Sequence, residues 1–70
     1  MTIKFNKNFY NIEAIKKGIT AYKKLADFEI KEKKNFVEVT IKNIDKDFKD
    51  VLQDEFSNYI LAETKNVSQS

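Results

Sequence analysis

The chain has 70 residues with a net charge of +2, and it contains no Cys, no His, no Pro and one Gly. This length allows one domain, and without disulfides or a His/Cys zinc site its core must come from apolar packing alone. The 41% of hydrophobic residues, with six Phe and three Tyr, exclude an intrinsically disordered chain.

The composition also limits the chemistry. The side chains that most often act as nucleophile or general base, Cys and His, are missing, and the single glycine excludes a glycine-rich phosphate loop. We therefore expect no enzyme activity, no cofactor and no metal site. The lack of Cys and of a signal-like N-terminus favours the cytoplasm, and no apolar run is long enough to span a membrane.

The N-terminal third predicts a strand followed by a helix. Residues 2–6 alternate, with Ile3 and Phe5 on one side, which is typical of a strand with one wet face. Asn11 is a good N-cap, Glu13 suits the first turn, and the helix is expected to run to about Leu25. Its apolar arc comprises Ile12, Ile15, Gly18, Ile19, Tyr22, Leu25 and Ala26.

The middle of the chain predicts an antiparallel hairpin. Residues 27–32 alternate around Phe28 and Ile30, residues 33–35 form a polar turn, and residues 36–42 alternate again. The second of these strands is rich in β-branched residues, which suits a central position in a sheet.

A second helix is expected from a cap at Asp45, or at a neighbouring residue, to about Thr64. Val51 and Ala62 lie at the margin of its apolar stripe, and residues 66–70 are expected to form a frayed polar tail. The stripe consists of Phe48, Leu52, Phe56, Tyr59 and Ile60.

These elements predict a single α+β domain over residues 1–65 in the order β-α-β-β-α. Because each strand has one apolar face, the two helices should pack on one face of a three-stranded sheet. A split arrangement would place the third strand between the first two, which would then be joined by a right-handed crossover if they are parallel.

Several residues stand out as candidates for partner binding. Glu55 falls within the apolar arc of the second helix, where it either needs a cationic partner or extends its stem so that the carboxylate reaches water. Leu61 projects to the polar side of that helix and, with Phe36 on the outer strand face, could contribute to a dimer contact. Asn58 flanks the apolar arc as an ordinary surface amide.

Lysines are concentrated in residues 1–44, which carry ten Lys against five acids. A phosphate-binding patch is one interpretation. We favour a solvated helix face and a charged turn, because the aromatic residues follow the core pattern and Glu29, Glu32 and Glu38 dilute the lysines. Nucleic acid is thus a disfavoured partner. The lysines considered for such a patch are Lys16, Lys17, Lys23, Lys24, Lys31, Lys33 and Lys34.

Two segments resemble a known family. Residues 8–15, NFYNIEAI, resemble the Y-x-x-E-A-I start of HxsD-like proteins, the His-Xaa-Ser system protein D family. Residues 55–61, EFSNYIL, resemble the second-helix signature of that family, roughly E-F-x-N-x-x-L. Both occur at the matching places of a β-α-β-β-α order, and the resemblance spans about residues 3–64.

The resemblance implies a small accessory protein of a radical SAM system that modifies a ribosomally made peptide. Its partner would be the radical SAM enzyme or the precursor peptide, and Glu13, Glu55 and Asn58 become candidates for contact because they match the family motifs. A peptide could add as a strand at a free sheet edge. The alternative is a small self-associating structural domain that forms a homodimer through its open sheet or its second helix.

Overall fold

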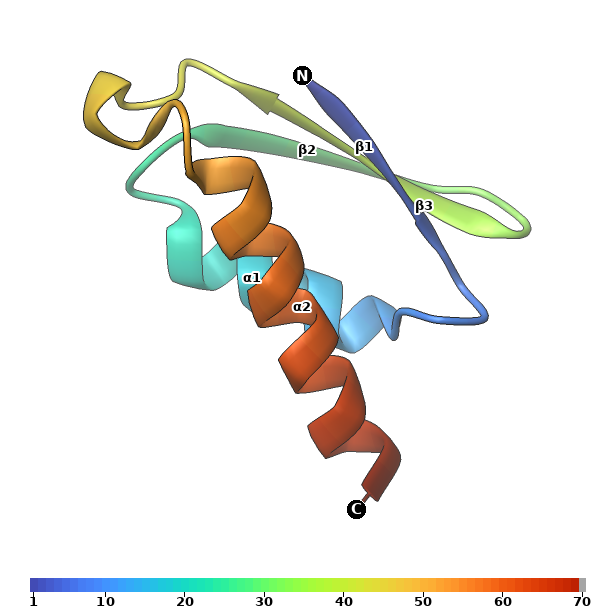
Figure 1. Ribbon diagram of the computed structural model, residues 1–70. Helices are drawn as coiled ribbons and strands as arrows, with labels where there is room; N and C mark the ends of the chain where they lie inside the picture. Colours follow the sequence, from blue (N-terminus) through green and yellow to red (C-terminus); the bar gives the residue numbers. More distant parts are fainter. Residues whose placement is uncertain (70) are drawn as a thin grey trace.

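The computed structural model describes the backbone of residues 1–69 and the side chains of residues 1–66. Two helices cover one face of a small sheet (Figure 1). In chain order the elements are β1 (Thr2–Asn6), α1 (Ile12–Tyr22), β2 (Asp27–Glu32), β3 (Phe36–Lys42), the 3-10 helix η1 (Lys46–Phe48) and α2 (Leu52–Gln69).

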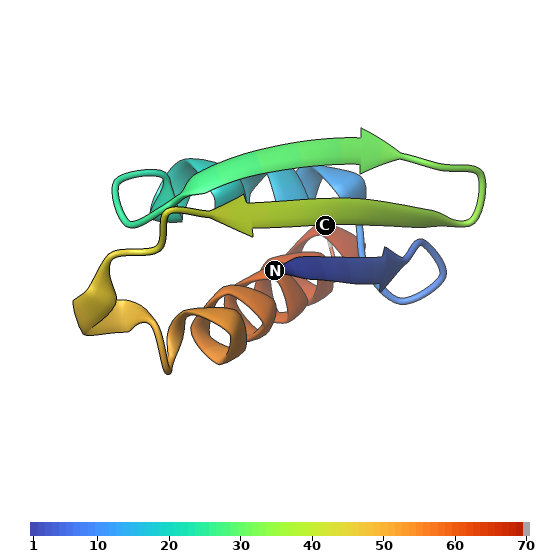
Figure 2. The ribbon, with the colours of Figure 1, turned by 90° about the horizontal axis from the view of Figure 1, so that it is seen from above.

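The sheet has three strands in the order β1-β3-β2, so the α+β architecture and the central position expected for the third strand are confirmed. Both outer strands pair antiparallel with β3, which makes β1 and β2 parallel to each other. Seen from above, α1 lies under β2 and α2 under β1 (Figure 2).

The core lies between the sheet and the helices, and Phe56 is at its centre with no exposed surface. The rings of Phe5, Phe28 and Tyr22 surround it at centroid distances of 6.0, 5.0 and 6.1 Å. Ala14 is also fully buried, although the predicted apolar arc of the first helix did not include it. The other packed residues follow the expected alternation and apolar arcs, and they are Ile15, Ala26, Val37, Val39, Ile41, Leu52 and Ile60.

Helix α1 begins as the sequence predicts and ends earlier. The Asn11 side chain accepts hydrogen bonds from the backbone N–H groups of Glu13 and Ala14, which are unpaired in any first helical turn. The prediction that the helix reaches Leu25 is wrong, because the helix ends at Tyr22. Leu25 instead accepts a 2.7 Å hydrogen bond at its carbonyl from the N–H of Asp45, which ties the end of α1 to the segment after β3.

The start of α2 also differs from the prediction. Asp45 is a cap, but it caps η1, where its carboxylate accepts the N–H of Asp47 at 2.9 Å. The helix proper begins at Leu52. Phe48, predicted within the apolar stripe, therefore lies in η1 and is 39% exposed, while Val51 is 48% exposed.

At its C-terminal end α2 continues to Gln69 rather than stopping near Thr64. No Gly or Pro follows Leu61, so the sequence holds no strong helix breaker there. The segment expected to be a frayed tail, residues 66–70, is helical through Gln69, and Ser70 is outside the described residues. No helix in the described part of the chain combines the length and apolar character that a bilayer span requires.

Candidate functional site

Helices α1 and α2 run antiparallel, which decides how the predicted site residues group. At one end the N–H of Asn11 donates to the Thr64 hydroxyl at 3.1 Å, and at the other end the rings of Tyr22 and Tyr59 are 5.7 Å apart. Glu13 therefore lies beside the C-terminal half of α2. Glu13 and Tyr22 are separated by about 13 Å along α1, at 1.5 Å per residue.

Glu55, Asn58 and Leu61 follow one another at three-residue intervals along α2, and all are exposed. This spacing makes Asn58 a neighbour of both Glu55 and Leu61, whereas Glu55 and Leu61 lie about 120° apart around the helix axis. The structure thus places Asn58 between Glu55 and Leu61 along α2, and Glu13 lies toward the Leu61 end of this row. The acid that falls in the apolar arc, Glu55, reaches solvent as its long stem allows.

Glu55 affects the ionisation of Tyr22 on the neighbouring helix α1. The pKa of the Tyr22 phenol is raised above its ordinary value, chiefly because burial disfavours the phenolate, and further by the negative charge of Glu55 and by Tyr59. An acid beside two tyrosines is not a nucleophile–base pair, and no group of three or more metal-binding side chains occurs in the described part of the chain.

The outer face of the sheet is polar. Lys4 lies over the ring of Phe36 at 5.2 Å, the hydroxyls of Thr2 and Thr40 are 3.3 Å apart, and Lys42 Nζ is 3.7 Å from Glu29. Phe36 is thus on the outer face, as predicted. Leu61 belongs to α2 on the other side of the sheet, so these two residues do not form one apolar patch.

The lysines of α1 and of the hairpin are exposed and lie among acids. Lys17 is 3.6 Å from Glu63, and Lys31 stands opposite Glu38 in the sheet. Lys16 contributes to the lowered pKa of Glu32, although the hydrogen bond from Lys7 is the main cause. Such mixed charge is typical of a solvated face rather than of a phosphate-binding surface.

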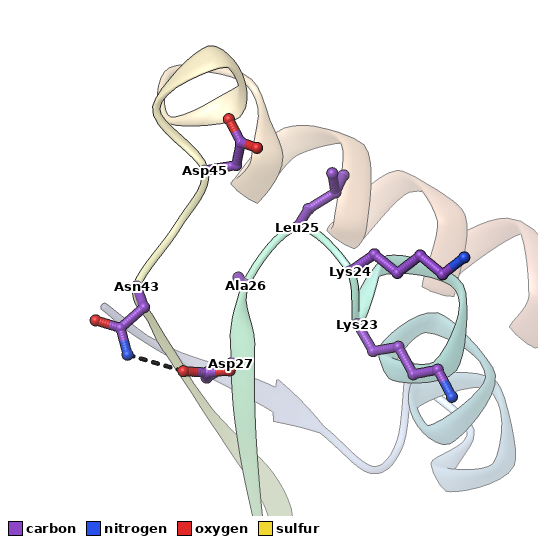
Figure 3. A pocket seen from close by; sticks show the side chains of 7 residues that line it. All are labelled: Lys23, Lys24, Leu25, Ala26, Asp27, Asn43 and Asp45. Atoms are coloured by element: carbon purple, nitrogen blue, oxygen red, sulfur yellow. Dashed lines mark hydrogen bonds between the residues drawn. The ribbon is translucent and has the colours of Figure 1, made fainter.

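A polar hollow of about 250 Å³ lies where the loop after α1 meets the segment after β3 (Figure 3). The Asp27 carboxylate in it already accepts a 2.8 Å hydrogen bond from the Asn43 amide. Lys23 and Lys24 extend away from that pair (Figure 3). Because its charged groups do not converge, the hollow is a poor candidate for a ligand site.

The strongest candidate is the pair of free sheet edges. In an antiparallel ladder, alternate residues direct N–H and C=O to the partner strand, and the residues between them direct these groups away. On β1 the N–H of Ile41 donates to Met1 O at 2.7 Å, so Met1, Ile3 and Phe5 bond to β3 in this register. The backbone groups of Thr2 and Lys4 therefore point out from the β1 edge.

The outward backbone groups of the β2 edge follow from its hydrogen bonds to β3 in the same way. The N–H of Lys33 donates to Phe36 O at 2.8 Å, so the odd-numbered residues of β2 bond to β3. The backbone groups of Phe28, Ile30 and Glu32 point away from the sheet. The sequence predicted an open sheet, but it could not tell which residues direct hydrogen-bonding groups outward, because that depends on the register.

The two edges differ in what lies beside them. Tyr59 and Glu63 contact α1, and at 100° per residue Leu61 lies about 160° around the axis of α2 from Glu63. Helix α2 lies under β1 (Figure 2), so a strand added at the β1 edge would extend the sheet on the side that α2 covers. Here Leu61 is 38% exposed.

No family model, no curated protein and no solved structure matches the chain.

Proposed function

We propose that the chain is a non-catalytic accessory protein of a radical SAM peptide-maturation system, and that it holds a peptide as an added strand along β1. The resemblance of residues 8–15 and 55–61 to HxsD-like proteins supplies the peptide system. The observation that carries the binding mode is the β1 edge, where the backbone groups of Thr2 and Lys4 point away from β3 and α2 lies under the strand (Figure 2). Strand addition supplies affinity through backbone hydrogen bonds and specificity through alternate side chains.

The end of this edge is defined by the chain itself. The carbonyl of Asn6 accepts hydrogen bonds from the N–H groups of Phe9 and Tyr10, both at 3.0 Å. This carbonyl is therefore occupied by the loop before α1 and does not offer an acceptor to an added strand. The usable edge is therefore the segment around Thr2 and Lys4, which suits a short extended peptide.

The surroundings suggest a peptide of alternating character. On the outer face the added strand passes Lys4, where a directly opposite acid is favourable. On the helix side it faces α2, and we propose that an apolar side chain of the peptide covers the exposed Leu61. We expect the bound peptide to carry an acid and an apolar residue at adjacent positions.

The outer surface of α2 provides a second contact in this proposal. Glu55 and Asn58 lie there, one turn apart, and they match the family motif. We assign them to contact with the enzyme, which leaves the β1 edge free for the peptide. Glu13, the remaining motif residue, is exposed in the first turn of α1, where its negative charge interacts favourably with the helix dipole.

The test is calorimetric titration of a synthetic precursor peptide, chosen from a gene adjacent to that of the chain, into the wild type and two proline variants. Lys4→Pro removes an N–H that points out of the sheet and leaves the ladder to β3 intact. Ile30→Pro makes the matched change on the β2 edge. We expect at least roughly tenfold weaker binding for Lys4→Pro alone, since backbone bonds carry the affinity. Equal affinities for all three proteins contradict the proposed binding mode.

A further inference from the structure

The β2 edge differs from the β1 edge in its charge pattern, and the difference identifies its partner. We propose that β2 pairs antiparallel with β2 of a second copy of this chain, with Ile30 opposite Ile30 on a two-fold axis. The result is a dimer with one continuous sheet and with both helix layers on the same side. This inference does not depend on the proposed function.

The backbone geometry permits this register. Phe28, Ile30 and Glu32 direct their N–H and C=O groups outward. Around Ile30, each outward residue meets an outward residue of the second copy: Ile30 meets Ile30, and Phe28 meets Glu32. Each such pair exchanges both backbone hydrogen bonds, so the interface contains roughly six of them.

The outer-face charges select this register over its neighbours. With Ile30 on the axis, Glu29 stands opposite Lys31 of the second copy and Asp27 stands opposite Lys33. Every charged pair on that face is then of opposite sign, which stabilises adjacent strands. A shift that centres Glu29 places two acids face to face, and a shift that centres Lys31 does the same with two lysines.

The helix-side face is compatible with the pairing. Ile30 is 38% exposed in the single chain, and contact with its counterpart would cover apolar surface. Glu32 is the inward-facing acid at this edge, and Lys7 Nζ holds its carboxylate at 2.9 Å, so its charge has a partner from its own chain.

The β1 edge lacks these properties. The outer-face residues there are Thr2, Lys4 and Asn6, which include no acid. Antiparallel self-pairing about Lys4 would oppose two lysines. Of the two edges, β2 is the one whose charges complement a second copy, and its use leaves both β1 edges free at the ends of the joined sheet.

A charge-exchange experiment tests the proposal by sedimentation equilibrium without any peptide. Glu29→Lys and Lys31→Glu each place like charges opposite one another in a homodimer, whereas a mixture of the two variants restores opposite charges. Both positions are exposed, so circular dichroism should show that each variant is folded.

We expect the wild type to dimerise, each variant alone to dimerise roughly tenfold more weakly, and the equimolar mixture to regain the wild-type affinity. Ile30→Pro should abolish the dimer, and Lys4→Pro should leave it unchanged. A monomeric wild type at millimolar concentration overturns the proposal, as does equal dimerisation of the wild type and both variants. Neither result bears on peptide binding at β1, which is measured separately.

Discussion

Gly18 of α1 packs directly against Ile60 of α2: a Cβ placed on Gly18 would lie 2.8 Å from Ile60 Cγ1 and 3.2 Å from a ring carbon of Phe56. The only glycine of the chain is thus a helical residue that allows the two helices to approach closely. The first distance is shorter than side-chain carbons tolerate, and Ile60 is branched at Cβ and buried, so it cannot move aside without disturbing the core.

Gly18→Ala should therefore lower the free energy of unfolding, although alanine is favoured over glycine inside a helix by about 1 kcal/mol. Overpacking costs about 1–3 kcal/mol, which leaves a net loss on the order of 1 kcal/mol. Urea denaturation measures it. Thr20→Ala, an exposed position on the same helix, is the control and should be neutral or slightly stabilising. A more stable Gly18→Ala protein would show that the helices are not in close contact here.

Phe56→Ala should destabilise the fold by about 3–5 kcal/mol, because it removes a fully buried ring from the centre of the aromatic cluster. In a domain of marginal stability this is enough to unfold much of the protein. Phe9→Ala is the matched control: Phe9 is 69% exposed, so its loss should change stability by about 0.5 kcal/mol or less. Thermal unfolding of both variants gives the comparison, and similar melting temperatures would contradict the packing described.

Asn11→Ala should cost about 1 kcal/mol, because it leaves the N–H groups of Glu13 and Ala14 without their side-chain acceptor. Asn11→Ser should retain most of the stability, since a hydroxyl can also accept from the first turn. Chemical denaturation distinguishes the two variants. Equal losses would mean that the amide stabilises something other than the helix start.

The Tyr22 phenol should ionise above the ordinary pKa of a tyrosine, and ultraviolet titration of the phenolate can measure it in comparison with Tyr22→Phe. A raised pKa means that the folded state holds its proton more tightly than the unfolded state does. Stability is then unaffected below about pH 10 and falls as the pH rises from there through the folded-state pKa. Glu55→Gln removes one cause of the shift and should lower this pKa. No change on that substitution would place Glu55 too far from Tyr22 to act on it.

The sequence predicted the β-α-β-β-α order because short-range signals agree with the final packing. Asn11 caps α1 and the alternation around Val39 defines β3, as expected from spacing alone. The start of α2 was mispredicted because Phe48 and Leu52 are four residues apart, which fits a helical stripe. The bond from Asp45 N–H to Leu25 O, between segments distant in sequence, holds the chain at the end of α1 before it turns into α2.

The candidate site was only partly predictable. The sequence placed Glu55 in the apolar arc of the second helix, Asn58 at its flank and Leu61 on its polar side, and all three are exposed in the structure. Alternation also showed which side chains face water. It could not show which backbone groups point out of the sheet. Whether the odd- or the even-numbered residues of an edge strand bond to β3 depends on how β1 and β2 pair with β3.

The most direct test of peptide binding at β1 is a nitrogen-15 NMR titration of the labelled protein with the precursor peptide. We expect the largest shift changes at the amides of Thr2 and Lys4, together with slowed hydrogen exchange at both, and little change at the amides of Phe28 and Ile30 on the other edge. A bound peptide that leaves the amides of Thr2 and Lys4 unchanged would contradict this binding mode.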